Sequence, residues 1–181
     1  IPEMADLSPG EKLALVDELD GLGGDLDFML IDTAAGIAGN VIYFNVAARE
    51  IIVVVSPEPT SITDAYALIK ILYSNHGEKR FMLLVNMARN SNEAREVFLK
   101  VSNATSHFLN LSIDYLGYVL EDTRVTDAVR QQRAFSEIYP DSRAAKCVQS
   151  IARKLCRLQP EACESGSLKF FWKSIVDNKR G

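Results

Sequence analysis

Four short apolar runs constrain the fold of this chain more than any other feature of its sequence. The runs lie at 28–32, 50–55, 81–85 and 113–120, and segments with helical apolar spacing separate them. Continuous apolar runs of this length are typical of strands buried on both faces, as in parallel sheets. We therefore predict an α/β fold with a parallel sheet and helices on both of its faces.

The apolar spacing also predicts where the helices lie. We expect them at about 9–21, 40–48, 60–73, 92–108 and 125–129, with a last one that starts at Pro140. Thr60 or Ser61 is predicted to cap the helix over 60–73. The apolar side of the helix over 92–108 is predicted to consist of Ala94, Val97, Val101, Ala104 and Phe108.

Asp32 ends the first apolar run, and the small residues Thr-Ala-Ala-Gly follow it at 33–36. The carboxyl edge of an open α/β sheet is where ligands bind, and small residues let backbone amides approach an anion. We interpret Asp32 as a carboxylate that orders a magnesium ion, through water, beside a nucleoside triphosphate. The alternative is that Asp32 only caps the next helix.

Composition excludes several classes of protein. The net charge of −4 gives no indication of a specific nucleic-acid partner. The three cysteines lie late in the chain without metal-type spacing, and no secretory leader precedes them, so we expect reduced thiols in the cytoplasm. His76 and His107 are isolated and have no ligand partners at useful spacing. No apolar run approaches the roughly 20 residues that a membrane-spanning helix needs.

The end of the chain predicts an amphipathic helix. A polar linker at 159–166 separates it from the preceding domain, 1–158, and the helix covers 167–181. One stripe of this helix is apolar and consists of Leu168, Phe171, Trp172, Ile175 and Val176. Lys169 and Lys173 lie on the other face. This pattern suits an anionic membrane interface, and a helix this short would bind more firmly when doubled in a dimer. Packing on its own domain or on a partner protein is the alternative.

Four stretches together resemble one family, the MinD/ParA ATPases with a deviant phosphate loop. They are 31–36 (Ile-Asp-Thr-Ala-Ala-Gly), 54–65 (Val-Val-Ser-Pro-Glu-Pro-Thr-Ser-Ile-Thr-Asp-Ala), 84–86 (Leu-Val-Asn) and 116–122 (Leu-Gly-Tyr-Val-Leu-Glu-Asp). The amphipathic end resembles the membrane-targeting helix of the MinD branch of this family. Within that branch, the run from Pro57 to Lys70 looks most like the flagellar number and placement regulators of the FlhG/FleN type. The resemblance implies a P-loop NTPase-like sheet that is incomplete at the N-terminus.

The resemblance implies roles for individual residues. Asp32 would hold magnesium through water, and Gly36 would offer an amide near the γ-phosphate. Asn86 would hydrogen-bond the adenine, although a strand-end turn residue is the alternative for it. The base would be flanked by the backbone of Leu120, Glu121 and Asp122. The side chains of the last two could equally cap the following helix.

Glu58 would lie near the partner subunit of an ATP-sandwiched homodimer, or it is a solvated loop charge. No Gly-Lys-Thr or Gly-Lys-Ser occurs in the sequence, so the phosphate loop of the family is absent. The family's catalytic residues would lie upstream, and this chain has none of them. We expect no ATP hydrolysis by this chain alone.

The resemblance implies an ATP- and magnesium-dependent regulator of flagellar number or placement. It would dimerise with ATP, bind the inner membrane peripherally and contact flagellar assembly proteins. One alternative is a nucleotide-free interaction module that binds flagellar or membrane partners. Another is a cell-division or partition ATPase of the same superfamily.

Overall fold

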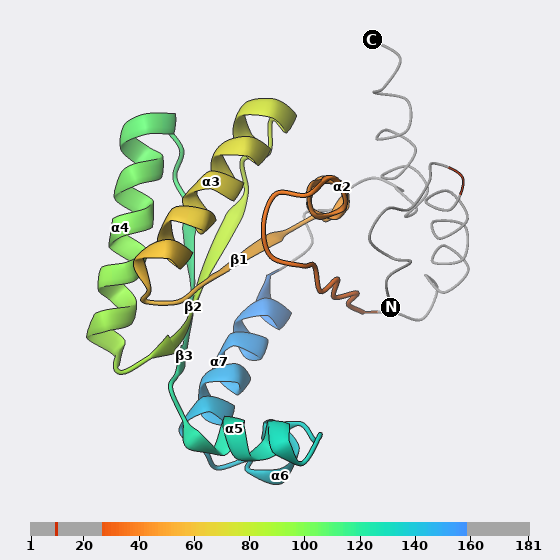
Figure 1. Ribbon diagram of the computed structural model, residues 1–181, viewed down its shortest axis with the longest axis vertical. Helices are drawn as coiled ribbons and strands as arrows, with labels where there is room; N and C mark the ends of the chain where they lie inside the picture. Colours follow the sequence, from red (N-terminus) through yellow and green to blue (C-terminus); the bar gives the residue numbers. More distant parts are fainter. Residues whose placement is uncertain (1–9, 11–26, 159–181) are drawn as a thin grey trace. The chain divides into compact units, whose positions relative to one another are not determined.

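The computed structural model describes Gly10 and residues 27–158, and the chain divides into two compact units (Figure 1). One unit consists of residues 1–49 and 160–181, and the other consists of residues 50–159. The predicted helix at 9–21 falls outside the described residues except for Gly10. The linker at 159–166 and the amphipathic helix at 167–181 lie outside them entirely.

The unit 50–159 is built around a parallel sheet of strand order β1-β2-β3. Its first part alternates strands and helices, in the order β1 Ile51–Val55, α3 Pro59–His76, β2 Phe81–Ala88, α4 Ser91–Leu109 and β3 Asp114–Leu120. Three helices follow, α5 Thr123–Arg130, α6 Phe135–Ile138 and α7 Arg143–Arg157. The predicted α/β class is confirmed, and α6 is an element that the apolar spacing did not reveal.

One face of the sheet is covered by α3 and α4, which also pack against each other (Figure 1). The strands are paired so that Ile51 lies beside Phe81 and Val55 beside Val85. Every second residue of β1 and β2 therefore points to this face, and these residues are buried: Ile51, Val53, Val55, Phe81, Leu83 and Val85. The main core of the unit lies here, between sheet and helices.

The other face of the sheet is covered at β3 by α7. The pairing of β2 with β3 shifts between Leu83 and Leu84, so Tyr115 and Gly117 point to opposite faces. The ring of Tyr115 lies 4.9 Å from that of Phe98 on α4. A Cβ added to Gly117 would lie 3.2 Å from Ile151 on α7, so this glycine lets the helix approach the strand closely. Helices therefore cover both faces, as predicted.

The start of α3 differs from the prediction. The N-cap residue is Glu58, whose side chain makes no capping bond, and Pro59 opens the helix. Ser61 does not cap the helix, because its Oγ accepts a hydrogen bond from the Ser56 amide at 3.0 Å. The helix ends at Gly77, whose φ of 74° is a left-handed conformation that glycine adopts without strain.

The buried side of α4 was predicted correctly as far as Val101, whereas the predicted Ala104 is only half-buried. Ala94, Val97 and Val101 are buried, whereas Phe108 is 70% exposed. Thr105 is the last buried residue of this helix, so the turn that carries Phe108 lies past the part that faces the sheet. Apolar spacing places a residue on a side of a helix, but it does not reveal how far the covered surface extends.

The unit 1–49 and 160–181 is described over residues 27–49. It contains α2, Gly39–Ala47, close to the predicted helix at 40–48. The predicted strand at 28–32 is wrong, because residues 28–34 form no strand and Phe28 and Leu30 are 57% and 82% exposed. A strand requires a neighbour for its backbone hydrogen bonds, and none pairs with this run among the described residues.

Candidate functional site

The carboxyl ends of the three strands bring several predicted site residues of unit 50–159 to one edge of the sheet. Val55 at the end of β1 pairs with Val85, and Ala88 at the end of β2 pairs with Leu120. The amide of Glu121 donates to the carbonyl of Ala88 at 2.9 Å, which continues the contact beyond the strands. The loop with the exposed Glu58, the end of β2 with Asn86, and residues 120–122 therefore share this edge.

Asn86 lies at an irregularity of β2. The pairing with β3 shifts between Val85 and Ala88, and Met87 between them has φ 57° and is 57% exposed. A left-handed φ is uncommon for a residue with a side chain, and such strain is often found at functional edges of sheets. The Oδ1 of Asn86 accepts from the Met87 amide at 2.9 Å, so Asn86 does stabilise this turn.

The side-chain NH2 group of Asn86 has no hydrogen-bond partner within residues 27–158. The turn uses only the oxygen of this side chain, and the two N–H donors remain available at the sheet edge. Ring nitrogens of a nucleotide base are acceptors that such donors can bind. The turn interpretation and the base-binding interpretation of Asn86 are therefore compatible.

Asp122 connects two helix starts at the same edge. Its Oδ1 accepts from the Arg124 amide at 3.0 Å and caps α5, and its Oδ2 accepts from the Ala144 amide at 3.2 Å in the first turn of α7. The hydrogen bond from the Arg124 amide is the main reason why the pKa of Asp122 lies below its ordinary value. The side chain of Asp122 therefore acts as a cap for both helices, whereas the exposed Glu121 is not the N-cap residue of α5.

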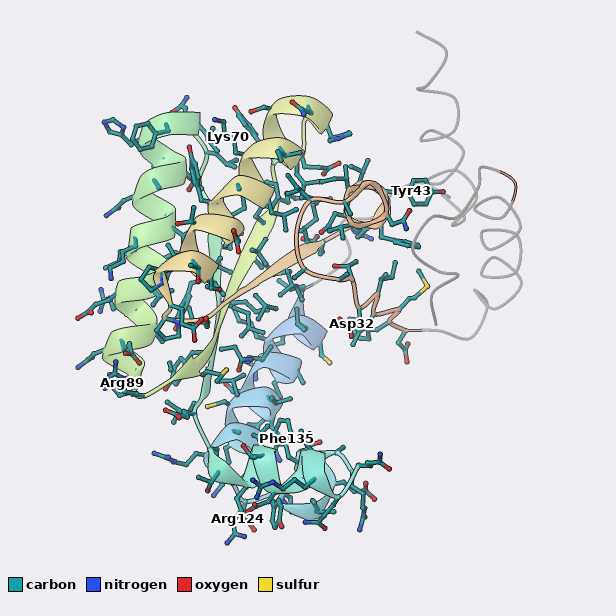
Figure 2. All side chains as sticks on the ribbon, viewed as in Figure 1. Asp32, Tyr43, Lys70, Arg89, Arg124 and Phe135 are labelled. Carbon is teal, nitrogen blue, oxygen red and sulfur yellow. The ribbon has the colours of Figure 1, made fainter. Side chains whose placement is uncertain are left out.

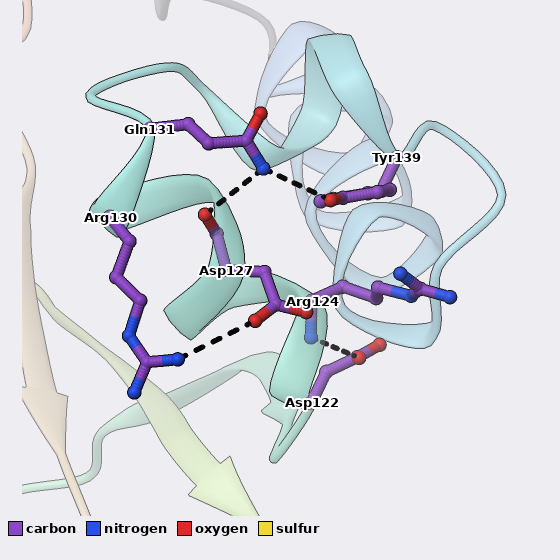
Figure 3. A network of polar contacts seen from close by, with 6 residues as sticks. All are labelled: Asp122, Arg124, Asp127, Arg130, Gln131 and Tyr139. Carbon is purple, nitrogen blue, oxygen red and sulfur yellow. Dashed lines mark hydrogen bonds and ion pairs between the residues drawn. The ribbon is translucent and has the colours of Figure 1, made fainter.

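A polar network beyond Asp122 joins α5 to Tyr139, which directly follows α6 (Figure 3). The Arg124 guanidinium lies 4.9 Å from the centre of the Tyr139 ring. The Nε2 of Gln131 donates to the Asp127 carbonyl and the Tyr139 hydroxyl, both at 3.2 Å. A depression of about 420 Å³ lies beside it, lined by Arg124, Ile138, Tyr139, Pro140, Asp141 and Ser142. No sequence pattern indicated this network, because its contacts join α5 to Tyr139, which follows a helix that the apolar spacing did not reveal.

Arg89, just after β2, places a cation close to the same edge (Figure 2). Its Nε lies 3.0 Å from Glu93 Oε1, and its amide donates to Glu93 Oε2 at 2.7 Å. The Glu93 amide in turn donates to Asn90 Oδ1 at 2.9 Å, which caps α4. These exchanged bonds resemble a capping box and fix the loop that follows Asn86.

Asp32 and Gly36 belong to the other unit, and Figure 2 shows Asp32 on the segment before α2. Asp32 is exposed, and the N-cap residue of α2 is Ala38, which has no side-chain capping bond. The interpretation of Asp32 as a helix cap is therefore wrong. Gly36 has φ 98°, a conformation that favours glycine. That Asp32, Asn86 and residues 120–122 surround one ligand stays a prediction.

The chain is similar to two known bacterial proteins over most of its length. No family model matches it. Antiactivator FleN of Pseudomonas aeruginosa is 40% identical over 175 residues, which are 97% of this chain and 62% of FleN. Flagellum site-determining protein YlxH of Helicobacter pylori is 31% identical over 174 residues, which are 94% of this chain and 58% of YlxH. The chain thus spans about three-fifths of the length of these relatives.

Solved structures of MinD have the same fold. MinD of Aquifex aeolicus matches with a TM-score of 0.67 and 20% identity, over 84% of this chain and 62% of that one. Septum site-determining protein MinD of Bacillus subtilis is 29% identical over 149 residues, which are 82% of this chain and 53% of that protein. The chain is thus similar in sequence and fold to proteins of the MinD/ParA type. The predicted resemblance, including its FleN-like character, is confirmed. MinD of Pyrococcus horikoshii, solved in complex with Mg-ADP, matches with a TM-score of 0.62 and 18% identity, over 88% of this chain and 65% of that one.

The described residues bring several hydrogen-bonding groups together at the carboxyl edge of the sheet. Asn86 offers unpartnered N–H donors, and the backbone at 120–122 lies beside it on the neighbouring strand end.

No group of three His, Cys, Asp or Glu residues that could hold a metal ion exists within residues 27–158. None of the helices in this part of the chain is long and apolar enough to cross a membrane.

Proposed function

We propose that this chain supplies the base-binding part of a MinD/ParA-type ATPase that regulates flagellar number or placement. The observation that carries the proposal is the pairing of Ala88 with Leu120, which places Asn86 and residues 120–122 on adjacent strand ends. The similarity to FleN and YlxH supports the flagellar role. ATP hydrolysis would require phosphate-binding residues that the sequence does not contain.

Each predicted residue has a proposed task in the intact protein. The NH2 group of Asn86 binds the base, and the backbone at 120–122 flanks it. Asp32 holds magnesium through water, and the Gly36 amide faces the terminal phosphate. Bound magnesium would neutralise phosphate charge, as in other phosphoryl-transfer sites. Glu58, exposed at the same edge as Asn86, lies at the interface of an ATP-dependent homodimer.

We also propose that residues 167–181 attach the protein peripherally to the inner membrane. Burying the apolar stripe of this segment in the interface would drive binding, and anionic headgroups would attract Lys169 and Lys173. Sedimentation with anionic vesicles tests this proposal on the chain with and without residues 167–181. We expect only the longer form to pellet, and equal pelleting of the two forms would end the proposal.

The nucleotide site is tested by Asn86→Ala in the product of the complete reading frame. Loss of its hydrogen bonds to the base should weaken binding of a fluorescent ADP analogue about 5- to 30-fold, as removal of one or two hydrogen bonds predicts. Asn92→Ala is the matched control, because Asn92 is an exposed residue of the same type in the first turn of α4. Equal affinity of the two variants would contradict the proposed role of Asn86.

A nucleotide-free interaction module is the second candidate. The absence of an upstream reading frame that encodes a Gly-Lys-Thr loop, together with tight partner binding by this chain alone, would favour it. In that case the chain would bind flagellar or membrane partners with the same affinity in the presence and absence of ATP and magnesium. A measurement of partner binding with and without ATP separates the two candidates, since the ATPase proposal requires a dependence on nucleotide.

A further inference from the structure

The helix α7 carries charge of a single sign. Its sequence contains five Lys and Arg residues and no Asp or Glu, although the whole chain has a net charge of −4. All five are exposed: Arg143, Lys146, Arg153, Lys154 and Arg157. At about 100° per residue they fall within an arc of about 100° on the helix. We call these five residues the basic stripe of α7.

The basic stripe lies opposite the side of α7 that packs on the sheet. Ala144 and Ala145 are buried, and Ile151 contacts the backbone position of Gly117 in β3. The packed side fixes the rotation of the helix about its axis. The stripe is therefore held outward by the fold, and its orientation does not depend on flexible side chains alone.

Neighbouring groups compensate only part of the stripe. Lys146 Nζ lies 3.6 Å from Asp141, the Arg143 guanidinium donates to the Glu121 carbonyl, and Lys154 donates to the Tyr115 carbonyl. Within residues 27–158, Arg153 and Arg157 have neither a hydrogen bond nor an ion pair from their side chains. Among the described residues, only Lys146 thus has a carboxylate beside it, and the two side chains without any partner lie at the C-terminal end of α7.

The other long helices of the unit do not show this pattern. The helix α4 mixes Glu93 and Glu96 with Arg95 and Lys100, and α3 combines Asp64 with Lys70. Mixed charges give little field at a distance, whereas a stripe of one sign attracts a surface of the opposite sign. Solvent exposure alone does not require that all charges on a helix face have the same sign. The five positive charges of the stripe therefore indicate an anionic partner.

We propose that the basic stripe of α7 binds the anionic headgroups of a lipid membrane together with residues 167–181. This inference rests on the proposed membrane attachment of that segment. The chain leaves α7 at Arg157 and reaches residue 167 after nine residues, which span at most about 30 Å. The apolar stripe that includes Phe171 and Trp172 suits a lipid interface better than nucleic acid, the other polyanion that a basic stripe could bind.

The test compares two double variants of the full chain. Arg153→Gln/Arg157→Gln removes the two cations without any partner among the described residues, and Arg95→Gln/Lys100→Gln removes two exposed cations from α4 as the matched control. Binding is measured by sedimentation with vesicles of phosphatidylcholine, with and without phosphatidylglycerol. Thermal melting of each variant checks that folding is unchanged.

We expect the α7 variant to lose on the order of 20-fold in partitioning to the anionic vesicles, or about five-fold for each cation. Its binding to pure phosphatidylcholine should not change, and the control variant should behave like the original chain. Added salt should remove the difference between the variants, because the headgroup attraction is screened.

Equal partitioning of the two double variants to anionic vesicles would overturn the inference. Deletion of residues 167–181 distinguishes this inference from the proposed function. If the deletion abolishes binding and the α7 variant has no effect, the membrane role of residues 167–181 stands and that of the basic stripe is rejected. If the preference for anionic vesicles survives the deletion and requires Arg153 and Arg157, the role of the stripe stands and that of residues 167–181 is rejected. Displacement of the chain from vesicles by double-stranded DNA, with the same two arginines required, would assign the stripe to nucleic acid and reject the lipid proposal.

Discussion

Asp122 shows how one side chain can organise the edge of a sheet. The residue follows β3 directly, and its two carboxylate oxygens accept from the amides of Arg124 and Ala144, which open different helices. The sequence predicted a cap for the helix that follows immediately. It could not predict the second bond, because Ala144 lies 22 residues away along the chain. Asn86 is similar, since its bond to Met87 is local but its place beside residues 120–122 depends on strand pairing.

Asp122→Ala should lower the free energy of unfolding by about 1–2 kcal/mol at pH 7, since a lost N-cap typically costs about 1 kcal/mol and two helix starts are affected. The pKa of Asp122 is lowered in the folded state, so its stabilisation is present above the unfolded pKa and is lost as pH falls through the folded pKa. Urea unfolding of both proteins from pH 7 to pH 3 should therefore show a difference that shrinks below about pH 4.

Asp122→Asn serves as the control for charge, because it keeps one acceptor oxygen but does not titrate in this range. Its stability loss should be smaller than that of Asp122→Ala, and the asparagine variant should lack the titratable contribution. A loss for Asp122→Ala that is the same at every pH would show that the carboxylate charge does not contribute.

At the scale of elements, the apolar spacing and the local capping residues explain where most of the helices and strands form. The helix α4 begins at the Asn90 cap, with Glu93 three residues later, and its buried side follows the predicted spacing through Val101. The outcome differs where an element needs a neighbour. The run at 28–32 has the composition of a buried strand, but it forms none without a pairing strand among the described residues.

Two substitutions on α4 test whether the stability contribution of a residue follows its observed burial or its place in the apolar spacing. Val101 is fully buried, so Val101→Ala should cost about 1–3 kcal/mol of unfolding free energy through lost burial and the cavity that remains. Phe108 is 70% exposed, so Phe108→Ala should cost less than about 0.5 kcal/mol although the side chain is larger. Chemical denaturation of both variants measures the difference. A larger cost at Phe108 than at Val101 would restore the original prediction that Phe108 faces the core.

At the scale of the whole molecule, the chain separates into two compact units with a boundary between Arg49 and Glu50. Unit 50–159 has its own core, which α3, α4 and α7 build on the two faces of its sheet. The second face of this sheet is less covered at β1, where Val54 is 55% exposed beside Leu84. Because the unit has a core of its own, we predict that it does not need residues 1–49 for folding.

Residues 50–159, produced alone, should therefore unfold cooperatively in urea and keep the near-ultraviolet circular dichroism of a packed core. Their unfolding midpoint should equal that of the same unit in the full chain, because the core residues belong to the unit itself. The full chain carrying Ile69→Ala serves as a reference for a damaged core, with an expected cost of about 2–5 kcal/mol. A non-cooperative transition of 50–159 would show that residues outside the unit complete its core.

The sequence alone determined the fold class, strands at about 50–55, 81–85 and 113–120, and the resemblance to the MinD/ParA ATPases, because continuous apolar runs, caps and short motifs are local properties. Tertiary structure decided what depends on neighbours. It exposed the run at 28–32 and Phe108, turned Gly117 toward α7 through a register shift, and joined α5 to α7 through Asp122. Burial and pairing depend on surfaces that other parts of the chain provide, and no single stretch of sequence contains that information.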